Sequence, residues 1–217
     1  MPRKDKGIRQ LTERDLWVLP WIAAQYAVRY DQLQRLLSRQ PGQRNKTKTG
    51  PQGITNSAVD QVIERWLEEP PLVEYDRGFR HTPGWIWLTP YGERELSLPY
   101  RKHNIRKGIL THKYYINQVR LDYEERHPEH RWKSEREIQR EQPRRERGAK
   151  MPHIPDGEIW RAGVRSFAIE VELSPKSDEQ MDAILEELLE GEDPFRAVWY
   201  FVSDHDEVAR EARRVVE

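Results

Sequence analysis

Residues 153–173 read HIPDGEIWRAGVRSFAIEVEL, and this stretch predicts two neighbouring strands, 153–160 and 164–173. Alternation along the second strand places Glu170 and Glu172 on one face and Ile169 and Val171 on the other. Burying carboxylates in a core strand without partners costs several kcal/mol each. A neutralising partner is therefore expected, and Mg²⁺ is a good candidate because it prefers oxygen ligands and can polarise a phosphodiester.

The segments on either side of this stretch complete a layered domain. Residues 109–125 have the spacing of a helix that carries Ile109, Ile116, Val119, Tyr123 and, on the same face, His112. The other expected elements are a strand over 131–139, a helix capped by Ser177 or Asp178, a strand over 195–202 buried on both faces, and a helix over 204–216. This order predicts a mixed sheet covered by helices.

The first two helices of the chain are expected near the N-terminus. A helix starting after Thr12 has one face formed by Leu16, Leu19, Ala23 and Tyr26. Pro20 lies inside it and should kink it or delay its start. A second helix is predicted over 31–39, with Asp31 as its N-cap.

A third helix and a hairpin follow. Residues 55–67 show the spacing of a buried stripe, formed by Val59, Val62, Ile63 and Trp66. Two short strand-like runs come next, 72–75 and 85–89. Three helices followed by a β-hairpin are typical of a winged helix-turn-helix, in which the third helix enters the major groove of DNA.

The polar side chains around the third helix are the candidate DNA contacts. Its outward face offers Asn56, Ser57, Gln61 and Arg65, types that suit base edges and phosphates. The preceding loop and the wing supply positive charge through Arg44, Lys46, Lys48, Arg77, Arg80 and His81. The alternative is a winged helix that serves protein contact or dimerisation.

Composition excludes several classes of protein. Among 217 residues there is no Cys, which excludes disulfides, thiol nucleophiles and Cys-ligated metals. No apolar run is long enough to span a membrane, and a cytoplasmic location is expected. Residues 1–110 carry a net charge of +7 and residues 111–217 a net charge of −7, which suggests two modules with different partners.

The chain resembles two known groups of proteins. The PD at 155–156 and the EVE at 170–172 resemble the motif of the PD-(D/E)XK nuclease superfamily over about residues 109–203. The whole chain is similar to the bacterial replication-relaxation family of plasmids and integrative elements. The similar segments are LTERD at 11–15, WLTPYG at 87–92, LTHKYYIN at 110–117, PDG at 155–157 and AIEVELSPKS at 168–177.

The resemblance implies a fold and a site. The fold would be α+β or α/β, with a winged-helix domain over 8–98 and a restriction-endonuclease-like αβββαβ domain over 99–217. Asp156 and Glu170 would bind Mg²⁺ or Mn²⁺. The usual Lys of the motif is replaced by Glu172, and Lys176 could fold back to serve. His112, Glu135 or Glu137 would add a ligand or orient the phosphate.

Two hypotheses of different classes follow. In the first, the protein is a metal-dependent DNA endonuclease or nickase that acts in replication, relaxation or transfer of a mobile element. In the second, it is a non-catalytic DNA-binding accessory protein or transcriptional regulator with a degenerate nuclease-like domain. Double-stranded DNA is the partner in both, with other mobile-element proteins as further candidates. A double-strand cut would require two active sites and hence a homodimer.

Overall fold

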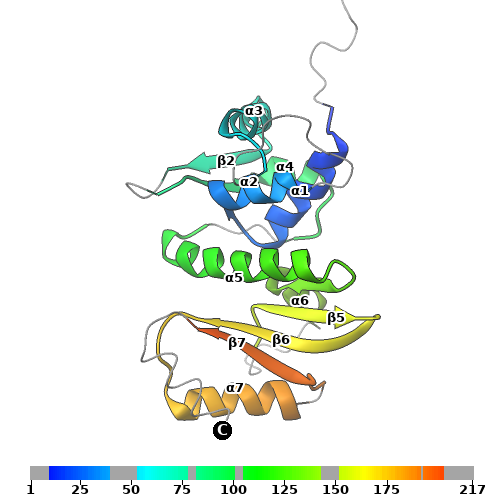
Figure 1. The fold of residues 1–217 in the computed structure, drawn as a ribbon, viewed down its shortest axis with the longest axis vertical. Coiled ribbons are helices and arrows are strands. Elements are labelled where there is room, and N and C mark those ends of the chain that lie inside the picture. Colours follow the sequence, from blue (N-terminus) through cyan, green and yellow to red (C-terminus); the bar gives the residue numbers. More distant parts are fainter. Residues whose placement is uncertain are drawn as a thin grey trace, which may run out of the picture. The chain divides into compact units, whose positions relative to one another are not determined.

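The computed structural model describes residues 10–39, 53–77, 82–100, 105–142, 152–191 and 193–202. Two compact units can be distinguished. The first comprises the described residues up to Ala23 together with Ala27–Pro99, and the second comprises Ala24–Tyr26 and the described residues from Tyr100 onward. Both units mix helices with a small sheet, so the fold is α+β (Figure 1).

The first unit surrounds a three-stranded antiparallel sheet. Its elements are α1 (Glu13–Ala24), β1 (Val28–Arg29), α2 (Tyr30–Ser38), α3 (Asn56–Leu67), β2 (Val73–Asp76), β3 (Trp85–Leu88) and α4 (Pro90–Glu95). The strand order is β1-β3-β2, so the hairpin β2–β3 gains a third strand from between α1 and α2. The stripe predicted on α3 is confirmed, because Val59, Val62, Ile63 and Trp66 are all buried.

Two details of the first helices differ from the prediction. Helix α1 starts at Glu13 despite Pro20, and it buries Val18, Leu19, Ile22 and Ala23, while Leu16 is 56% exposed. The reason is that the buried Asp15 lies on the same side of the helix as Val18, Leu19 and Ile22, so this side faces the core. Helix α2 begins at Tyr30 with Arg29 as N-cap, and Asp31 binds the Arg29 guanidinium instead of capping.

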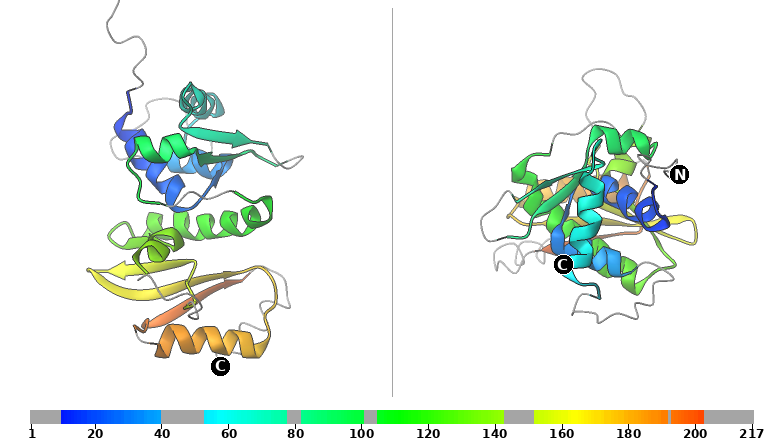
Figure 2. Two further views of the ribbon diagram at one scale, coloured as in Figure 1. Left: turned by 180° about the vertical axis from the view of Figure 1, so that it is seen from behind. Right: turned by 90° about the horizontal axis from the view of Figure 1, so that it is seen from above.

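The second unit is a four-stranded sheet between two helices. Its elements are α5 (Lys107–Arg126), β4 (Arg131–Ser134), α6 (Glu135–Glu141), β5 (Gly157–Arg161), β6 (Val164–Glu172), α7 (Asp178–Glu190) and β7 (Ala197–Val202). The order is β4-β5-β6-β7, with β6 and β7 parallel and the other pairs antiparallel. Helices α5 and α7 cover opposite faces of this sheet (Figure 2).

The apolar residues of β6 divide between the two faces. Ile169 and Val171 pack with Ile116 and Tyr123 of α5, whereas Ala168 packs with Leu188 of α7. This division confirms the alternation expected for the strand. It leaves Glu170 and Glu172 together on the face opposite α5.

A tight turn joins β5 to β6, and a β-bulge next to Ile159 and Trp160 shifts their register further along the strands. Arg161 pairs with Val164, and the two residues between them, Ala162 and Gly163, have φ of 49° and 77°. Two successive positive φ values are typical of a type I′ turn, whose twist matches that of the flanking strands. Glycine suits the second position, while alanine is unusual at the first.

Two predicted strands were partly wrong. The strand over 131–139 ends at Ser134, because Ser134 and Glu137 form a reciprocal capping box that starts α6. Glu135 and Glu137 therefore lie on a helix. Strand β7 is half-buried rather than buried on both faces, since among the described strands it pairs only with β6. The helix expected over 204–216 lies outside the described residues.

Candidate active site

The three acidic residues of the motif gather at one end of β5 and β6. The register pairs Gly157 with Ile169, which places Asp156, just before β5, beside Glu170. Glu170 and Glu172 are 5% and 6% exposed. Three carboxylates, two of them deeply buried, therefore share a small region of the second unit.

Asp156 is held by the strand and by α5. Its Oδ2 atom accepts a hydrogen bond from the amide of Val171 at 2.9 Å. His112 Nε2 lies 3.3 Å from the same oxygen and 2.8 Å from the carbonyl oxygen of Val171. Burial lowers the pKa of His112, but the contacts with Asp156 and Val171 raise it above its ordinary value overall. His112 thus lies beside Asp156 at this end of the sheet.

Glu170 is paired with a histidine that sequence reasoning missed. His153 Nε2 lies 2.8 Å from Glu170 Oε1, and the His153 amide donates to Glu187 on α7 at 2.6 Å. The bond to Glu170 raises the pKa of His153. Burial raises the pKa of Glu170 even though His153 opposes this shift. The signal in the sequence was the position of His153, three residues before Asp156 in HIPD.

Lys176 returns to the end of β6. Its Nζ atom contacts Glu172 Oε2, while Glu172 Oε1 accepts from the amide of Ser174 at 3.3 Å. The charge of Lys176 also lowers the pKa of Glu170 and of His153, so the ammonium group acts on these two residues as well as on Glu172. Lys176 is thus paired with Glu172, and its role as the lysine of the motif stays a prediction.

Tyr200 on β7 is a second residue that the sequence did not single out. It pairs with Glu170 across the parallel strands, and its hydroxyl oxygen is buried without a hydrogen-bond partner among the described residues. Burial raises the pKa of Tyr200, and the charges of Glu170 and Asp156 raise it further.

Glu135, by contrast, lies at the start of α6, where it binds Lys113 at 2.6 Å and Gln139 at 2.6 Å.

The outward face of α3 is partly engaged within its own unit. Ser57 and Gln61 are exposed, and the Asn56 side chain accepts from Gln34 at 2.9 Å. Arg65 has a structural contact, because its guanidinium lies 2.5 Å from the buried Asp15 carboxylate. Ser57 and Gln61 therefore remain the strongest candidates for contacts with DNA.

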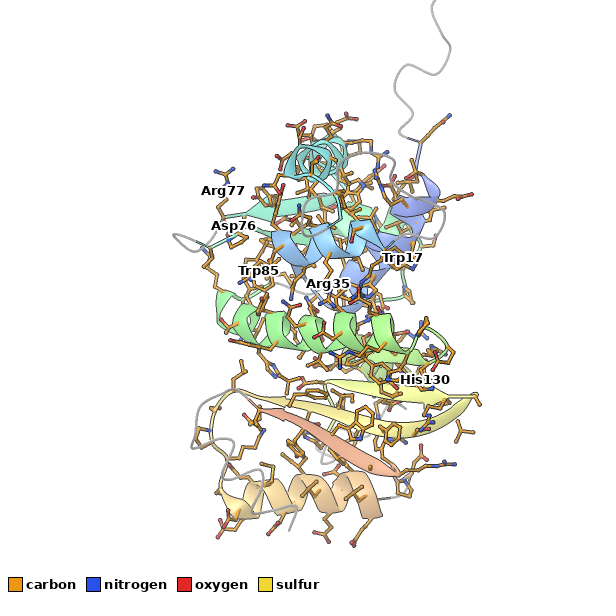
Figure 3. All side chains as sticks on the ribbon, in the orientation of Figure 1. Trp17, Arg35, Asp76, Arg77, Trp85 and His130 are labelled. Carbon is orange, nitrogen blue, oxygen red and sulfur yellow. The ribbon has the colours of Figure 1, made fainter. Side chains whose placement is uncertain are left out.

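The basic candidates are described only in part. Arg77 is exposed and follows the end of β2 (Figure 3). Arg44, Lys46, Lys48, Arg80 and His81 lie outside the described residues.

Comparison with known proteins identifies no relative. No family model, no curated protein and no solved structure matches the chain. The resemblances drawn from the short motifs therefore stay predictions. Among the described helices, none combines the length and apolar character needed to cross a membrane.

Proposed function

We propose that the protein binds double-stranded DNA through its first unit, acting as a winged helix-turn-helix. The order of α1, β1, α2 and α3 followed by the hairpin β2–β3 supports this proposal. Helix α3 would enter the major groove with Ser57 and Gln61 toward the bases, and Arg77 would reach the backbone beside it. Binding would depend steeply on salt, as neutralisation of phosphates releases counterions.

The second unit is proposed to hydrolyse a phosphodiester bond of that DNA with Mg²⁺ or Mn²⁺. The observation that carries this proposal is the convergence of Asp156 and Glu170 from neighbouring strands, with Lys176 at the same strand end. Its setting would be the replication, relaxation or transfer of a plasmid or other mobile element.

The residues present fit a magnesium ion. Carboxylate oxygens of Asp156 and Glu170 and the nearby carbonyl oxygen of Val171 are hard donors of the kind that Mg²⁺ takes. The buried hydroxyl of Tyr200 without a described partner, beside the same carboxylates, is consistent with a hydrated ion as a missing neighbour. Burial raises the pKa of Glu170 because it disfavours the charged carboxylate, and a positive ion bound beside Glu170 would stabilise that charged form.

Each residue then has a role. Asp156 and Glu170 would hold the ion, which when bound would polarise the phosphodiester and activate water. Lys176, kept near by Glu172, would face the phosphate charge. His112 and His153 would orient the two metal-binding carboxylates through the hydrogen bonds that they already make.

One observation favours the second hypothesis, a non-catalytic accessory protein. Each acid already has a protein partner: Asp156 has His112, Glu170 has His153 and Glu172 has Lys176. Such pairing lets the sheet fold without an ion. A degenerate domain would keep the same contacts and have no reaction.

Supercoiled plasmid distinguishes the two hypotheses. We expect open-circular or linear DNA with Mg²⁺ or Mn²⁺ at low salt, no conversion in EDTA, and loss of conversion in Asp156→Asn and Glu170→Gln. Asp182→Asn, an exposed acid on α7, is the matched control and should cleave normally. If wild-type protein binds DNA and leaves it intact with either metal, the nuclease proposal is wrong.

DNA binding has a separate test. Gln61→Glu adds a negative charge to the exposed face of α3, whereas Ala183→Glu adds the same charge to the exposed side of α7. We expect Gln61→Glu alone to weaken binding to duplex DNA in a mobility-shift assay at low salt. Equal binding by both variants would exclude α3 as the recognition helix.

A further inference from the structure

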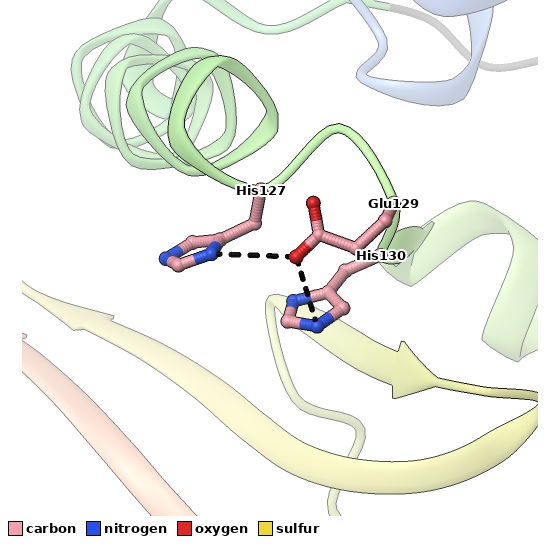
Figure 4. A group of neighbouring side chains, drawn as sticks. All are labelled: His127, Glu129 and His130. Carbon is pink, nitrogen blue, oxygen red and sulfur yellow. Dashed lines mark ion pairs between the residues drawn. The ribbon is translucent and has the colours of Figure 1, made fainter.

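A second cluster of metal-binding side chains lies at the other end of α5. Residues 127–130 read HPEH and connect α5 to β4. Glu129 Oε1 lies 3.7 Å from His127 Nδ1 and 3.3 Å from His130 Nε2 (Figure 4). All three ligand atoms lie within 4.8 Å of one another.

The two separations to Glu129 are close to those of ligands around one small ion. Zn²⁺ binds imidazole nitrogen and carboxylate oxygen at about 2.0–2.1 Å in a tetrahedral arrangement. Two ligands at that bond length lie about 3.3–3.4 Å apart. One of the two separations to Glu129 is already of this size, and the other needs to shorten by a few tenths of an ångström. The two histidine nitrogens lie within 4.8 Å of each other and would also approach.

The turn is organised before any ion binds. The His127 amide donates to the carbonyl of Tyr123 at 2.9 Å, and the His130 amide donates to the carbonyl of His127 at 3.0 Å. The two imidazole rings stack at 5.2 Å between centroids. Pro128 restricts the backbone between them. Binding an ion would therefore require the two rings to turn from this arrangement, but little further ordering of the backbone.

An outer contact orients one of the ligands. The hydroxyl of Tyr123 lies 2.7 Å from His130 Nδ1. With an ion bound, the proton would lie on Nδ1, this hydroxyl would accept the hydrogen bond, and the lone pair of Nε2 would face the ion. A polar partner on the second ring nitrogen is the usual companion of a metal-binding histidine.

We propose that His127, Glu129 and His130 form a site for a divalent transition metal, Zn²⁺ in particular, with a fourth position open to water or a donor from another molecule. Two imidazoles and one carboxylate suit Zn²⁺ better than Mg²⁺, which takes oxygen ligands. His112 and His127 are fifteen residues apart along α5 and its C-cap, or about 22 Å at the rise of an α-helix. The site is therefore separate from the cluster of Asp156 and Glu170.

The test is titration of the full chain with ZnCl₂ by calorimetry in the presence of excess Mg²⁺. We expect one equivalent of Zn²⁺ to bind, and affinity to fall on the order of tenfold or more in His127→Asn and in Glu129→Ala. Glu125→Ala removes an exposed acid from the last turn of α5 and is the matched control, with unchanged affinity. Asp156→Asn should also leave binding unchanged.

Glu129 is exposed, so its variant tests the site without disturbing the core. Co²⁺ provides a second readout, because a four-coordinate site that includes both histidines should give strong visible absorption that His127→Asn abolishes. Unchanged Zn²⁺ affinity in Glu129→Ala and His127→Asn would overturn the proposal. So would loss of Zn²⁺ binding in Asp156→Asn, or a wild-type chain that binds no Zn²⁺.

Discussion

Replacement of Asp15 should cost the first unit more stability than replacement of any exposed acid. The Asp15 side chain is 1% exposed, and its two oxygens accept four hydrogen bonds. The donors are the amide and hydroxyl of Thr12, each at 2.8 Å, the guanidinium of Arg65 at 2.5 Å and the indole N–H of Trp66 at 2.9 Å. These contacts join the start of α1 to the last turn of α3.

The size of the effect follows from what Asp15→Ala leaves behind. The indole N–H of Trp66 becomes a buried donor without an acceptor, and Arg65 loses its counter-ion. Removing one member of a buried charged pair costs about 3–5 kcal/mol. The Arg65 side chain is 29% exposed and can regain water, so the lower figure applies. At roughly 4–8 °C for each kcal/mol in a unit of this size, the melting temperature should fall by at least about 12 °C.

The matched control is Asp31→Ala. Asp31 also pairs with an arginine, at 2.6 Å, but its side chain is 32% exposed, so its loss should cost no more than about 1 kcal/mol. Calorimetry of both full-length variants, with hydrogen exchange measured on peptides from α3, reports on this unit directly. If the two variants melt within about 4 °C of each other, equivalent to roughly 1 kcal/mol, the buried network does not hold α1 to α3.

Three further substitutions test other parts of the structure. Gly92→Ala should lower the free energy of unfolding by about 1–3 kcal/mol, because a β-carbon would collide with the carbonyl of Leu72. In the control, Gly108→Ala, the added β-carbon meets no atom within 4 Å, so this change should be neutral or stabilising. Urea unfolding curves compare the two variants, and equal midpoints would contradict the collision. Ala162→Asn should stabilise the protein by up to about 1 kcal/mol, because Asn tolerates the positive φ of a type I′ turn. A urea midpoint below that of the wild-type protein would argue against this turn. Glu170→Gln should raise the melting temperature of the protein in EDTA. Burial raises the pKa of Glu170, so its charged form is destabilising at neutral pH, and glutamine removes that charge. A lower melting temperature would mean that the hydrogen bond between Glu170 and His153 outweighs the cost of burial.

Periodic patterns were the part of the fold that the sequence predicted best. Helix α3 and strand β6 each have a complete repeat of apolar and polar positions, and the structure buries the expected sides. The grouping of Glu170 and Glu172 on one face also followed from alternation alone.

Contacts between distant segments could not be predicted in this way. The inward turn of Asp15 depends on Arg65 and Trp66, which are about fifty residues away. His153 contacts Glu170 because the antiparallel pairing of β5 and β6 brings the segment before β5 beside the end of β6. The capping box of Ser134 was present in the sequence, but the strand-like composition of 131–139 obscured it.

The alternation of apolar and acidic residues in β6 limits how its sequence can change during evolution. A one-residue slip of β6 in its pairing with β5 would exchange the two faces of the strand and move Ile169 and Val171 out of the core. Selection for a folded sheet therefore preserves the placement of the acids even when nothing selects for the acids themselves. Replacing one acid, in contrast, alters the chemistry and leaves the apolar face in place. In the nuclease proposed above, one such substitution would remove the reaction and keep the architecture, and a reversal would restore it.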